Sequence, residues 1–444
     1  MKEFSPVSFS DACGWALIVA LSGGADSVSL LHMLARQRQA LDLRLLAVHV
    51  EHGIRGEDSR ADAEFCKSIC DSLDVPIQIV SLDVPAEAKR TGQGLETVAR
   101  AMRYAALDRI LAEAHADRIA LAHHLNDQAE TVLMHLLRGC GLKGACGMAR
   151  DDGRLYRPLL NAKKSDLEKY LLDRGLSWRT DCTNRIPDTP RNALRLHGIP
   201  ALEESYSSAQ EAIARFAECA QIENRFMERE TDRFLNARLE AGPYGARILH
   251  PEQADEAILR RAIERVCPSD YLAIAAVARL AQSAHGKRTI SKSCIVERTP
   301  DAIYFLNPAP QLPAPAFLPM EGCAAFGNLG QMRVARCAAV PVRNDPFRQA
   351  LRRDALEGTI LRTRRDGDRI RPLGCGEKPL SDFFIDRRID RPLRDFIPLV
   401  ARGNEILWAV GCAISESARL RSDADDALEL SPRSVTTLIF NDIL

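Results

Sequence analysis

Short apolar runs alternate with helical repeats along the first part of the chain. The runs have the length of buried strands, whereas the repeats bring apolar side chains to one face every third or fourth residue. Strands are predicted over 15–21, 43–50, 77–80 and 118–122. Helices are predicted after the glycines at 23 and 24 and over 58–73, 95–115, 126–138 and 165–174. This alternation indicates an α/β fold with a doubly wound parallel sheet, in which ligands bind beyond the carboxyl ends of the strands.

The pattern changes after residue 200. Residues 201–284 are rich in Ala, Glu and Arg with long amphipathic periods, which predict helices, and a strand follows over 290–305. Prolines concentrate between 308 and 319, as in a linker. We therefore predict an α/β domain over 1–200, a mainly helical middle domain over 201–310, a proline-rich linker region over 311–344 and a small α+β domain over 345–444.

Composition is that of an ordinary globular protein. Of 444 residues, 46% are apolar and 27% charged, and the 60 basic and 60 acidic residues cancel. A nucleic acid would therefore have to bind to local basic patches. The sequence shows no signal-peptide pattern and no run of 18 apolar residues. We therefore expect the protein in the cytoplasm and expect no membrane among its partners. The 13 cysteines contain no C-x-x-C pair, which favours neither disulfides nor a metal cluster.

The glycine turn after the first strand has the features of an anion site. Two glycines let the backbone turn sharply, and the first amides of the following helix point outward without intrahelical partners. The helix dipole adds about half a positive charge there, so phosphate is the expected ligand. The loop comprises Ser22, Gly23, Gly24, Ala25, Asp26 and Ser27.

Asp26 separates this loop from a Walker A loop, because no lysine follows the glycines. A carboxylate beside phosphates would repel them unless a hard cation such as Mg²⁺ lay between. Asp26 therefore suggests pyrophosphate held through Mg²⁺. A glycine turn in which Asp26 only helps to cap its helix is the simpler alternative.

A second group of candidate residues follows the strand predicted at 118–122. His123 and His124 precede a helix whose first turn carries Asp127 and Glu130, three residues apart and therefore on one side. Acids in a first helical turn ordinarily interact with the helix dipole. Beside two histidines and a nucleotide loop, the pair suggests recognition of a cationic substrate or removal of its proton.

Arg100 and Arg103 follow Glu96 along one face of the helix predicted over 95–115. Such a stripe is usually a solvated set of ion pairs worth a few tenths of a kcal/mol. Two guanidinium groups directed toward a phosphate cleft would instead clamp a triphosphate or an RNA backbone. The sequence leaves both interpretations open.

Two further segments carry candidate contacts to RNA. Asn184 and Arg191 lie in a loop-rich stretch that suits a surface closing over nucleotide and RNA, although a plain domain exit explains it almost as well. Arg364 and Arg365 belong to an arginine cluster near the end of the chain. Interleaved acids allow either a salt-bridged face or a patch for a phosphate backbone.

These motifs together resemble the tRNA(Ile)-lysidine synthetases, bacterial enzymes of the PP-loop ATP pyrophosphatase superfamily. The SGGADS loop marks only the superfamily, while the resemblance runs nearly end to end. The more specific matches are AHHLNDQAET at 122–131, RGCG at 138–141, IRPLG at 370–374 and DFFID at 382–386. One departure lies in HVEHGIR at 49–55, where Glu51 replaces the Asn or Asp usual in the family.

The resemblance implies one reaction. ATP adenylates the C2 oxygen of the wobble cytidine in a tRNA(Ile) with a CAU anticodon, and pyrophosphate leaves. The ε-amine of free L-lysine then displaces AMP and forms lysidine, which changes codon reading from AUG to AUA. The resemblance also implies that Asp26 acts through Mg²⁺ and that Asp127, with Glu130 beside it, contacts lysine.

The remaining roles follow from the same resemblance. Arg100 or Arg103, together with His123, would face the α-phosphate or the cytidine. Asn184 and Arg191 would lie near the same site. The middle and final domains would bind the body of the tRNA, with Arg364 and Arg365 as the expected contacts.

Other functions fit the sequence less well. A PP-loop tRNA thiolase typically carries a C-x-x-C pair, and a glutamine-dependent synthetase needs an amidotransferase domain; the chain has neither pattern. A nucleotide-binding RNA adaptor without chemistry would not need Asp127 and Glu130 in the cleft. The sequence does not determine how tRNA(Ile) is told from tRNA(Met), nor whether the long helices pair into a homodimer.

Overall fold

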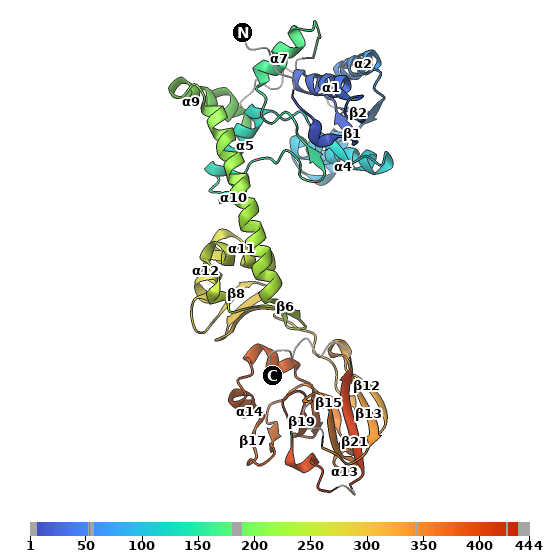
Figure 1. The fold of residues 1–444 in the computed structure, drawn as a ribbon, viewed down its shortest axis with the longest axis vertical. Coiled ribbons are helices and arrows are strands. Elements are labelled where there is room, and N and C mark those ends of the chain that lie inside the picture. Colours follow the sequence, from blue (N-terminus) through green and yellow to red (C-terminus); the bar gives the residue numbers. More distant parts are fainter. Residues whose placement is uncertain are drawn as a thin grey trace. The chain divides into compact units, whose positions relative to one another are not determined.

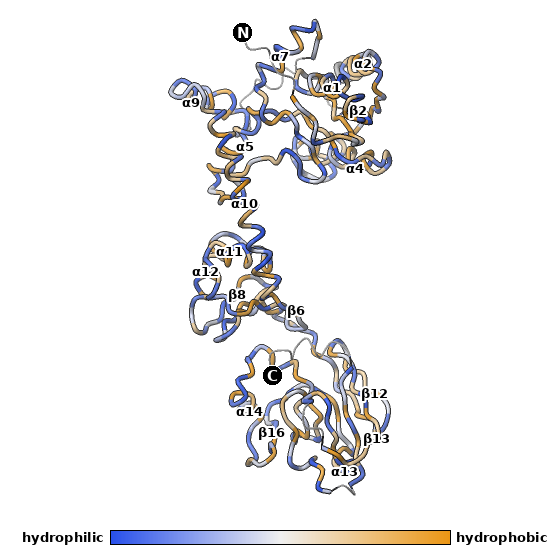
Figure 2. Tube along the Cα trace, viewed as in Figure 1, coloured by the Kyte–Doolittle hydropathy of each residue, from blue (hydrophilic) through white to orange (hydrophobic). Residues whose placement is uncertain are grey.

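The computed structural model describes residues 7–51, 53, 57–179, 189–341, 345–422 and 425–433 (Figure 1). The chain forms two compact units, Met1–Phe226 and Met227–Leu444. The division falls inside the long helix α10 (Ala209–Arg238) and not near residue 200, where the sequence pattern changes. Figure 2 shows hydrophilic and hydrophobic residues alternating along this helix.

The first unit is built on a five-stranded parallel sheet with the order β3-β2-β1-β4-β5. The strands are β1 (Ala16–Ala20), β2 (Arg44–Glu51), β3 (Ile77–Ser81), β4 (Arg118–Ala120) and β5 (Leu155–Tyr156). The first four match the predicted strands to within a few residues. The doubly wound α/β fold is thereby confirmed.

Both faces of this sheet are covered by helices, because side chains of a strand alternate between faces. Leu17 and Val19 of β1 pack into one cluster with α1 (Ala25–Gln37), α2 (Glu57–Ser72) and α7 (Lys164–Leu172). Ile18 packs on the opposite face against α4 (Leu95–Glu113). Each apolar repeat in the sequence thus corresponds to a helix covering the sheet.

Shorter elements complete the first unit. They are α3 (Val84–Thr91), α5 (Leu125–Leu137), α6 (Leu142–Ala145), α8 (Pro190–Ala193), a π-helical turn (Leu194–Gly198) and α9 (Ile199–Ser205). Among them, α5 begins just beyond β4, at the carboxyl edge of the sheet where ligands are expected. Within the described residues, no helix of either unit is both long and apolar enough to cross a membrane.

The second unit begins with a mixed region. The expected helices are present as the end of α10, α11 (Glu256–Val266) and α12 (Tyr271–Ala281). They pack on an antiparallel sheet with the order β6-β7-β10-β9-β8. Its strands are β6 (Leu239–Gly242), β7 (Gly245–Leu249), β8 (Gly286–Ser291), β9 (Cys294–Arg298) and β10 (Ala302–Leu306). The hairpin over 239–249 was not predicted, because it lies in a stretch whose composition indicated helix; within the sheet, β7 also pairs with the distant β10.

The rest of the second unit contains two further sheets. One has the order β11-β15-β18-β19-β16-β17 with β20 beside β19, and the other has the order β12-β13-β21-β14. The first sheet consists of β11 (Ala316–Phe317), β15 (Ile360–Arg362), β16 (Arg369–Ile370), β17 (Lys378–Pro379), β18 (Leu399–Arg402), β19 (Glu405–Ala409) and β20 (Ala413–Ile414). The second consists of β12 (Gly322–Ala325), β13 (Gln331–Cys337), β14 (Gln349–Arg352) and β21 (Ala427–Arg433). Two short helices, α13 (Arg353–Leu356) and α14 (Leu380–Asp386), accompany them.

These sheets correct the linker predicted over 311–344. Three strands, β11, β12 and β13, lie in that stretch. All seven residues of β13 pair with β21, which lies about ninety positions later in the chain. Pairing over that distance leaves no local signal, so the prolines dominated the sequence pattern.

Candidate active site

The glycine loop joins β1 to α1 at the carboxyl edge of the parallel sheet. Gly23 has a φ of +85°, and a Cβ there would lie 3.3 Å from the Cys66 thiol, so the position requires glycine. The Ser27 hydroxyl accepts a hydrogen bond from the Ser22 amide at 3.2 Å and donates to the Gly24 carbonyl at 3.0 Å. These bonds fix the turn, while the amides at the start of α1 lack intrahelical partners and suit an anion.

Neighbouring elements hold the loop from both sides. The Nδ1 atom of His49, buried at the end of β2, lies 2.8 Å from the Leu21 carbonyl oxygen. The Arg179 amide donates to the Gly23 carbonyl at 2.9 Å, and its side chain donates to Asp62 of α2 at 2.7 Å. His52 and Arg55, which follow His49 in the sequence motif, lie outside the described residues.

Asp26 is a half-buried carboxylate with one unsatisfied oxygen. Its Oδ1 atom is buried and has no hydrogen-bond partner, and its Oδ2 atom lies 3.6 Å from Nε2 of His124. Burial raises the pKa of Asp26, and the charges of His124 and Lys164 offset only part of that shift. Such a carboxylate favours a cation nearby, which fits the predicted Mg²⁺. Within the described residues, no group of three or more His, Cys, Asp or Glu side chains gathers around a possible metal position.

Asp127 lies in the first turn of α5, as predicted, whereas Glu130 lies three residues further on, in the second turn. Asp127 accepts a hydrogen bond from the His124 amide at 3.1 Å, which caps the helix. Glu130 is only 1% exposed. Nε of Arg191 donates to Glu130 at 2.7 Å and Nε of Arg195 at 2.6 Å, and both arginines also reach Asp127 at 3.2–3.3 Å.

The two acids of α5 and the two arginines that bind them therefore form a cluster whose charges cancel. Burial opposes ionisation of Asp127, yet its pKa lies below the usual value, because neighbouring positive groups outweigh burial. Those groups are His124, His123 and Arg191. Glu130 is saturated by its arginines, whereas Asp127 also approaches Nε2 of His124 at 3.4 Å and borders the Asp26 region. Asp127 is the less enclosed of the two acids: 14% of its side chain is exposed, against 1% for Glu130.

His123, two residues before α5, is a half-buried histidine. Burial is the main cause that lowers the pKa of His123 to about 4, against the opposing charge of Asp127. The guanidinium groups of Arg157, Arg191 and Arg100 lower it further. His123 is therefore a neutral imidazole at physiological pH, suited to hydrogen bonding and not to charge pairing.

Arg100 and Arg103 lie over the ring of Tyr104, with guanidinium carbons 5.1 and 5.5 Å from its centroid. Arg100 also influences His123 and so belongs to the surroundings of the cluster on α5. Arg154 approaches the same ring at 5.4 Å. The predicted contact of Arg100 or Arg103 with a phosphate stays a prediction.

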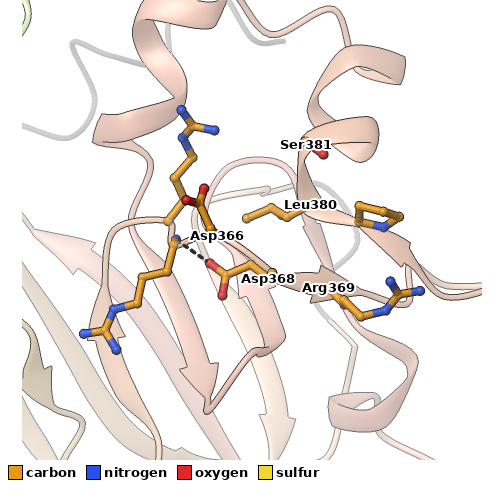
Figure 3. Close-up of a pocket in the computed structure, with 9 residues that line it drawn as sticks. Asp366, Asp368, Arg369, Leu380 and Ser381 are labelled. Atoms are coloured by element: carbon orange, nitrogen blue, oxygen red, sulfur yellow. Dashed lines mark hydrogen bonds between the residues drawn. The ribbon is translucent and has the colours of Figure 1, made fainter.

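The remaining candidates are not part of this group. Asn184 lies outside the described residues. Arg364 and Arg365 belong to the second unit, where residues 364–369 and 379–381 line a hollow of about 190 Å³ (Figure 3). Nε of Arg364 contacts Asp395 at 2.5 Å, and the Arg365 side chain is exposed.

Three residues contribute although the sequence did not single them out as site residues. Arg195 shares Glu130 and Asp127 with Arg191, and its spacing of four residues from Arg191 was the available signal. Arg179 contacts the glycine loop, and Gln128 packs behind the acid pair. Their partners lie far away in the sequence, so no local pattern reveals these contacts.

Comparisons with known proteins agree with this arrangement. A family model described as a PP-loop domain matches residues 8–202, and one described as the TilS substrate C-terminal domain matches residues 359–429. The tRNA(Ile)-lysidine synthase of Caldanaerobacter subterraneus subsp. tengcongensis is 32% identical over 442 residues, covering 93% of this chain and 92% of that protein. The enzyme of the same name from Symbiobacterium thermophilum is 34% identical over 446 residues, with coverage of 93% and 92%. That of Geobacter sulfurreducens is 31% identical over 433 residues, with coverage of 92% and 91%.

The phosphate loop, the acid pair beyond β4 and the end-to-end similarity lead to one assignment. The chain belongs to the tRNA(Ile)-lysidine synthase family and is an ATP-using ligase.

Proposed function

We propose that the protein joins free L-lysine to the wobble cytidine of a tRNA(Ile) with a CAU anticodon. In the first step the C2 oxygen of the cytidine attacks the α-phosphorus of ATP, and pyrophosphate leaves. In the second step the ε-amine of lysine forms a bond to C2, and the C2–oxygen bond breaks to release AMP. The observation that carries this proposal is the bridge formed by His124, whose Nε2 lies 3.6 Å from Asp26 and 3.4 Å from Asp127.

The phosphate loop serves the first step. The amides at the start of α1 donate hydrogen bonds to the leaving pyrophosphate and stabilise the charge that develops on it. Ser22 and Ser27 keep the loop in its turn through their mutual bonds. Arg100 or Arg103 neutralises the α-phosphate, and neutral His123 donates or accepts a hydrogen bond at the cytidine. Asp26 would hold Mg²⁺, which would neutralise part of the charge of the phosphates.

Asp127 serves the second step. The lysine amine has an ordinary pKa near 10.4 and arrives as an ammonium ion, so a carboxylate must hold it before it loses its proton. Asp127 is ionised and lies near Asp26. It accepts hydrogen bonds from Arg191 and Arg195, which also bind Glu130. Glu130 supports Asp127 indirectly, since it anchors the two arginines against α5.

The second unit provides contacts to the body of the tRNA. The hollow in Figure 3 is bordered by Arg364, Arg365 and Arg369, which suits backbone phosphates. Asn184 and Arg191 are proposed to lie near the cytidine and the nucleotide in the first unit. This assignment divides the work between chemistry on α1 and α5 and binding of the tRNA body by the second unit.

Incorporation of radiolabelled lysine tests the proposal. The wild-type protein is incubated with ATP, Mg²⁺ and a tRNA(Ile) transcript that carries CAU, in parallel with the same transcript carrying UAU. We expect label only in the cytidine-bearing tRNA, with one AMP released for each lysine joined. AMP formation without label would show that another nucleophile is used, and label in both transcripts would exclude cytidine as the target.

A further inference from the structure

Gln128 lies between Asp127 and Glu130 in sequence, and the mechanism above does not use it. Its side chain is 4% exposed, and both ends of its amide bind the backbone of Met148. Nε2 donates to the Met148 carbonyl at 2.9 Å, and Oε1 accepts from the Met148 amide at 2.8 Å. The residue thus fastens the segment 146–148 to the helix that carries the acid pair.

Gly147 shows how closely this segment approaches α5. Its φ is +59°, and a Cβ at this position would lie 2.7 Å from Oε1 of Gln128 and 2.9 Å from Val132. A side chain here would displace the amide from Met148. The contact therefore depends on glycine beside the glutamine.

Gln221 of α10 holds the same segment from the other side. Its Nε2 atom donates to the Cys146 carbonyl at 2.8 Å and to the Met148 carbonyl at 3.0 Å. The Met148 carbonyl thus accepts from both glutamines. We call Gln128, the backbone of 146–148 and Gln221 the amide clamp.

The clamp closes a ring around the acid pair. Arg191 and Arg195 hold Asp127 and Glu130 at the front of α5. The chain then continues through α9 into α10, where Gln221 binds the backbone of Cys146 and Met148. The stretch 189–226 therefore contacts α5 directly through Arg191 and Arg195, and indirectly through Met148, which also binds Gln128. A displacement of α10 from the clamp would shift the arginines that neutralise the acids.

We propose that Gln128 and Gln221 are positioning residues that set the placement of Arg191 and Arg195 against the lysine-binding acid Asp127. The inference rests on the proposed function, since it concerns the binding of lysine. It assigns a role to the glutamine of the AHHLNDQAET motif, and it explains why α10 is tied to the backbone of a loop in the catalytic unit.

Loss of the amide clamp is expected to affect the binding of lysine and not the phosphate loop. The KM values for lysine and for ATP therefore distinguish the two effects. In Gln221→Met the side chain keeps its length and loses both hydrogen bonds, at a half-buried surface position. We expect the KM for lysine to rise roughly tenfold, because small misplacements of binding groups have effects of that size, while the KM for ATP stays within about twofold. Glu223→Gln, an exposed change on the same helix, is the matched control and leaves both values unchanged.

A double variant links the clamp to the arginines. If the clamp acts through Arg195, Gln221→Met combined with Arg195→Lys raises the KM for lysine by less than the product of the single effects. An unchanged lysine KM in Gln221→Met, or equal rises for lysine and ATP, would overturn the inference. Both outcomes are read against a wild-type enzyme that forms lysidine; a wild type that forms none would overturn the proposed function instead.

Discussion

Two arginine-rich regions of this protein use the same residue type in different ways. Arg191 of α8 and Arg195 of the π-helical turn both bind Glu130 of α5, whose side chain is 1% exposed. Around β15 and β16, Arg362 and Asp368 form a pair in which both side chains are 1% exposed, whereas Arg364 pairs with an Asp395 that is 46% exposed and Arg365 lies toward solvent. In the first region two arginines, themselves about one-third exposed, neutralise a buried acid. In the second, one buried pair supports a surface that keeps positive charge exposed.

This difference shows that burial, and not the number of arginines, decides what a cluster does. A buried charge must be paired, since an unpaired one costs several kcal/mol, so its partners are fixed. An exposed guanidinium gains little from a neighbouring acid and is free to bind a phosphate. The first region is therefore expected to respond to mutation through structure and catalysis, and the second through tRNA affinity alone.

The largest effect is expected for Glu130→Gln. The change removes the negative charge that Arg191 and Arg195 share, so we expect a loss of roughly 2–4 kcal/mol in the free energy of unfolding. The loss is smaller than for a fully buried ion pair, because both arginines are about one-third exposed and partly screened by solvent. Denaturant unfolding measures it. Glu223→Gln makes the same chemical change at an exposed site and should cost less than about 0.5 kcal/mol. Equal stability of the two variants would contradict the buried cluster.

A smaller and more selective effect is expected in the second region. Arg364→Ala with Arg365→Ala should weaken tRNA binding and reduce the slope of log affinity against log salt by about 1 to 2, with ATP affinity unchanged. Arg365 should account for more of the loss, because Arg364 already contacts Asp395. Filter binding over a salt series measures this.

The matched control in that experiment is Arg402→Ala, which removes an exposed arginine of the same unit that pairs with Glu405. It should leave both tRNA affinity and salt slope at the wild-type values. Unchanged affinity in the Arg364 and Arg365 double variant would remove this surface from the tRNA interface.

The sequence predicted the parallel sheet well because each strand and helix there carries its own periodic pattern. The runs at 15–21 and 43–50 became β1 and β2 almost unchanged. The antiparallel sheets were harder, since β6 and β7 are short and lie in an Ala-rich and Arg-rich stretch with helical composition. β6 pairs with β7 across a short turn, and β7 joins the rest of the sheet by pairing with β10, which lies far along the chain.

The site divides in the same way. The loop at 22–27 and the acids at 127 and 130 were visible because their spacing within one turn carries the chemistry. The partners of Glu130 were not visible, since Arg195 lies 65 residues away. The resemblance to the family implied a lysine contact for Asp127 with Glu130 beside it, and that assignment stays a prediction.

Asp127 is proposed to bind the lysine amine, and the glycine loop to support adenylation of the tRNA. The two half-reactions of the Asp127→Asn variant test this division most directly. The measurement follows two products from ATP labelled in its α-phosphate: adenylated tRNA formed without lysine, and AMP released when lysine is added. We predict that adenylated tRNA accumulates at about the wild-type level while lysidine formation falls roughly a hundredfold or more. Unchanged lysidine formation, or an equal loss of both half-reactions, would contradict the assignment.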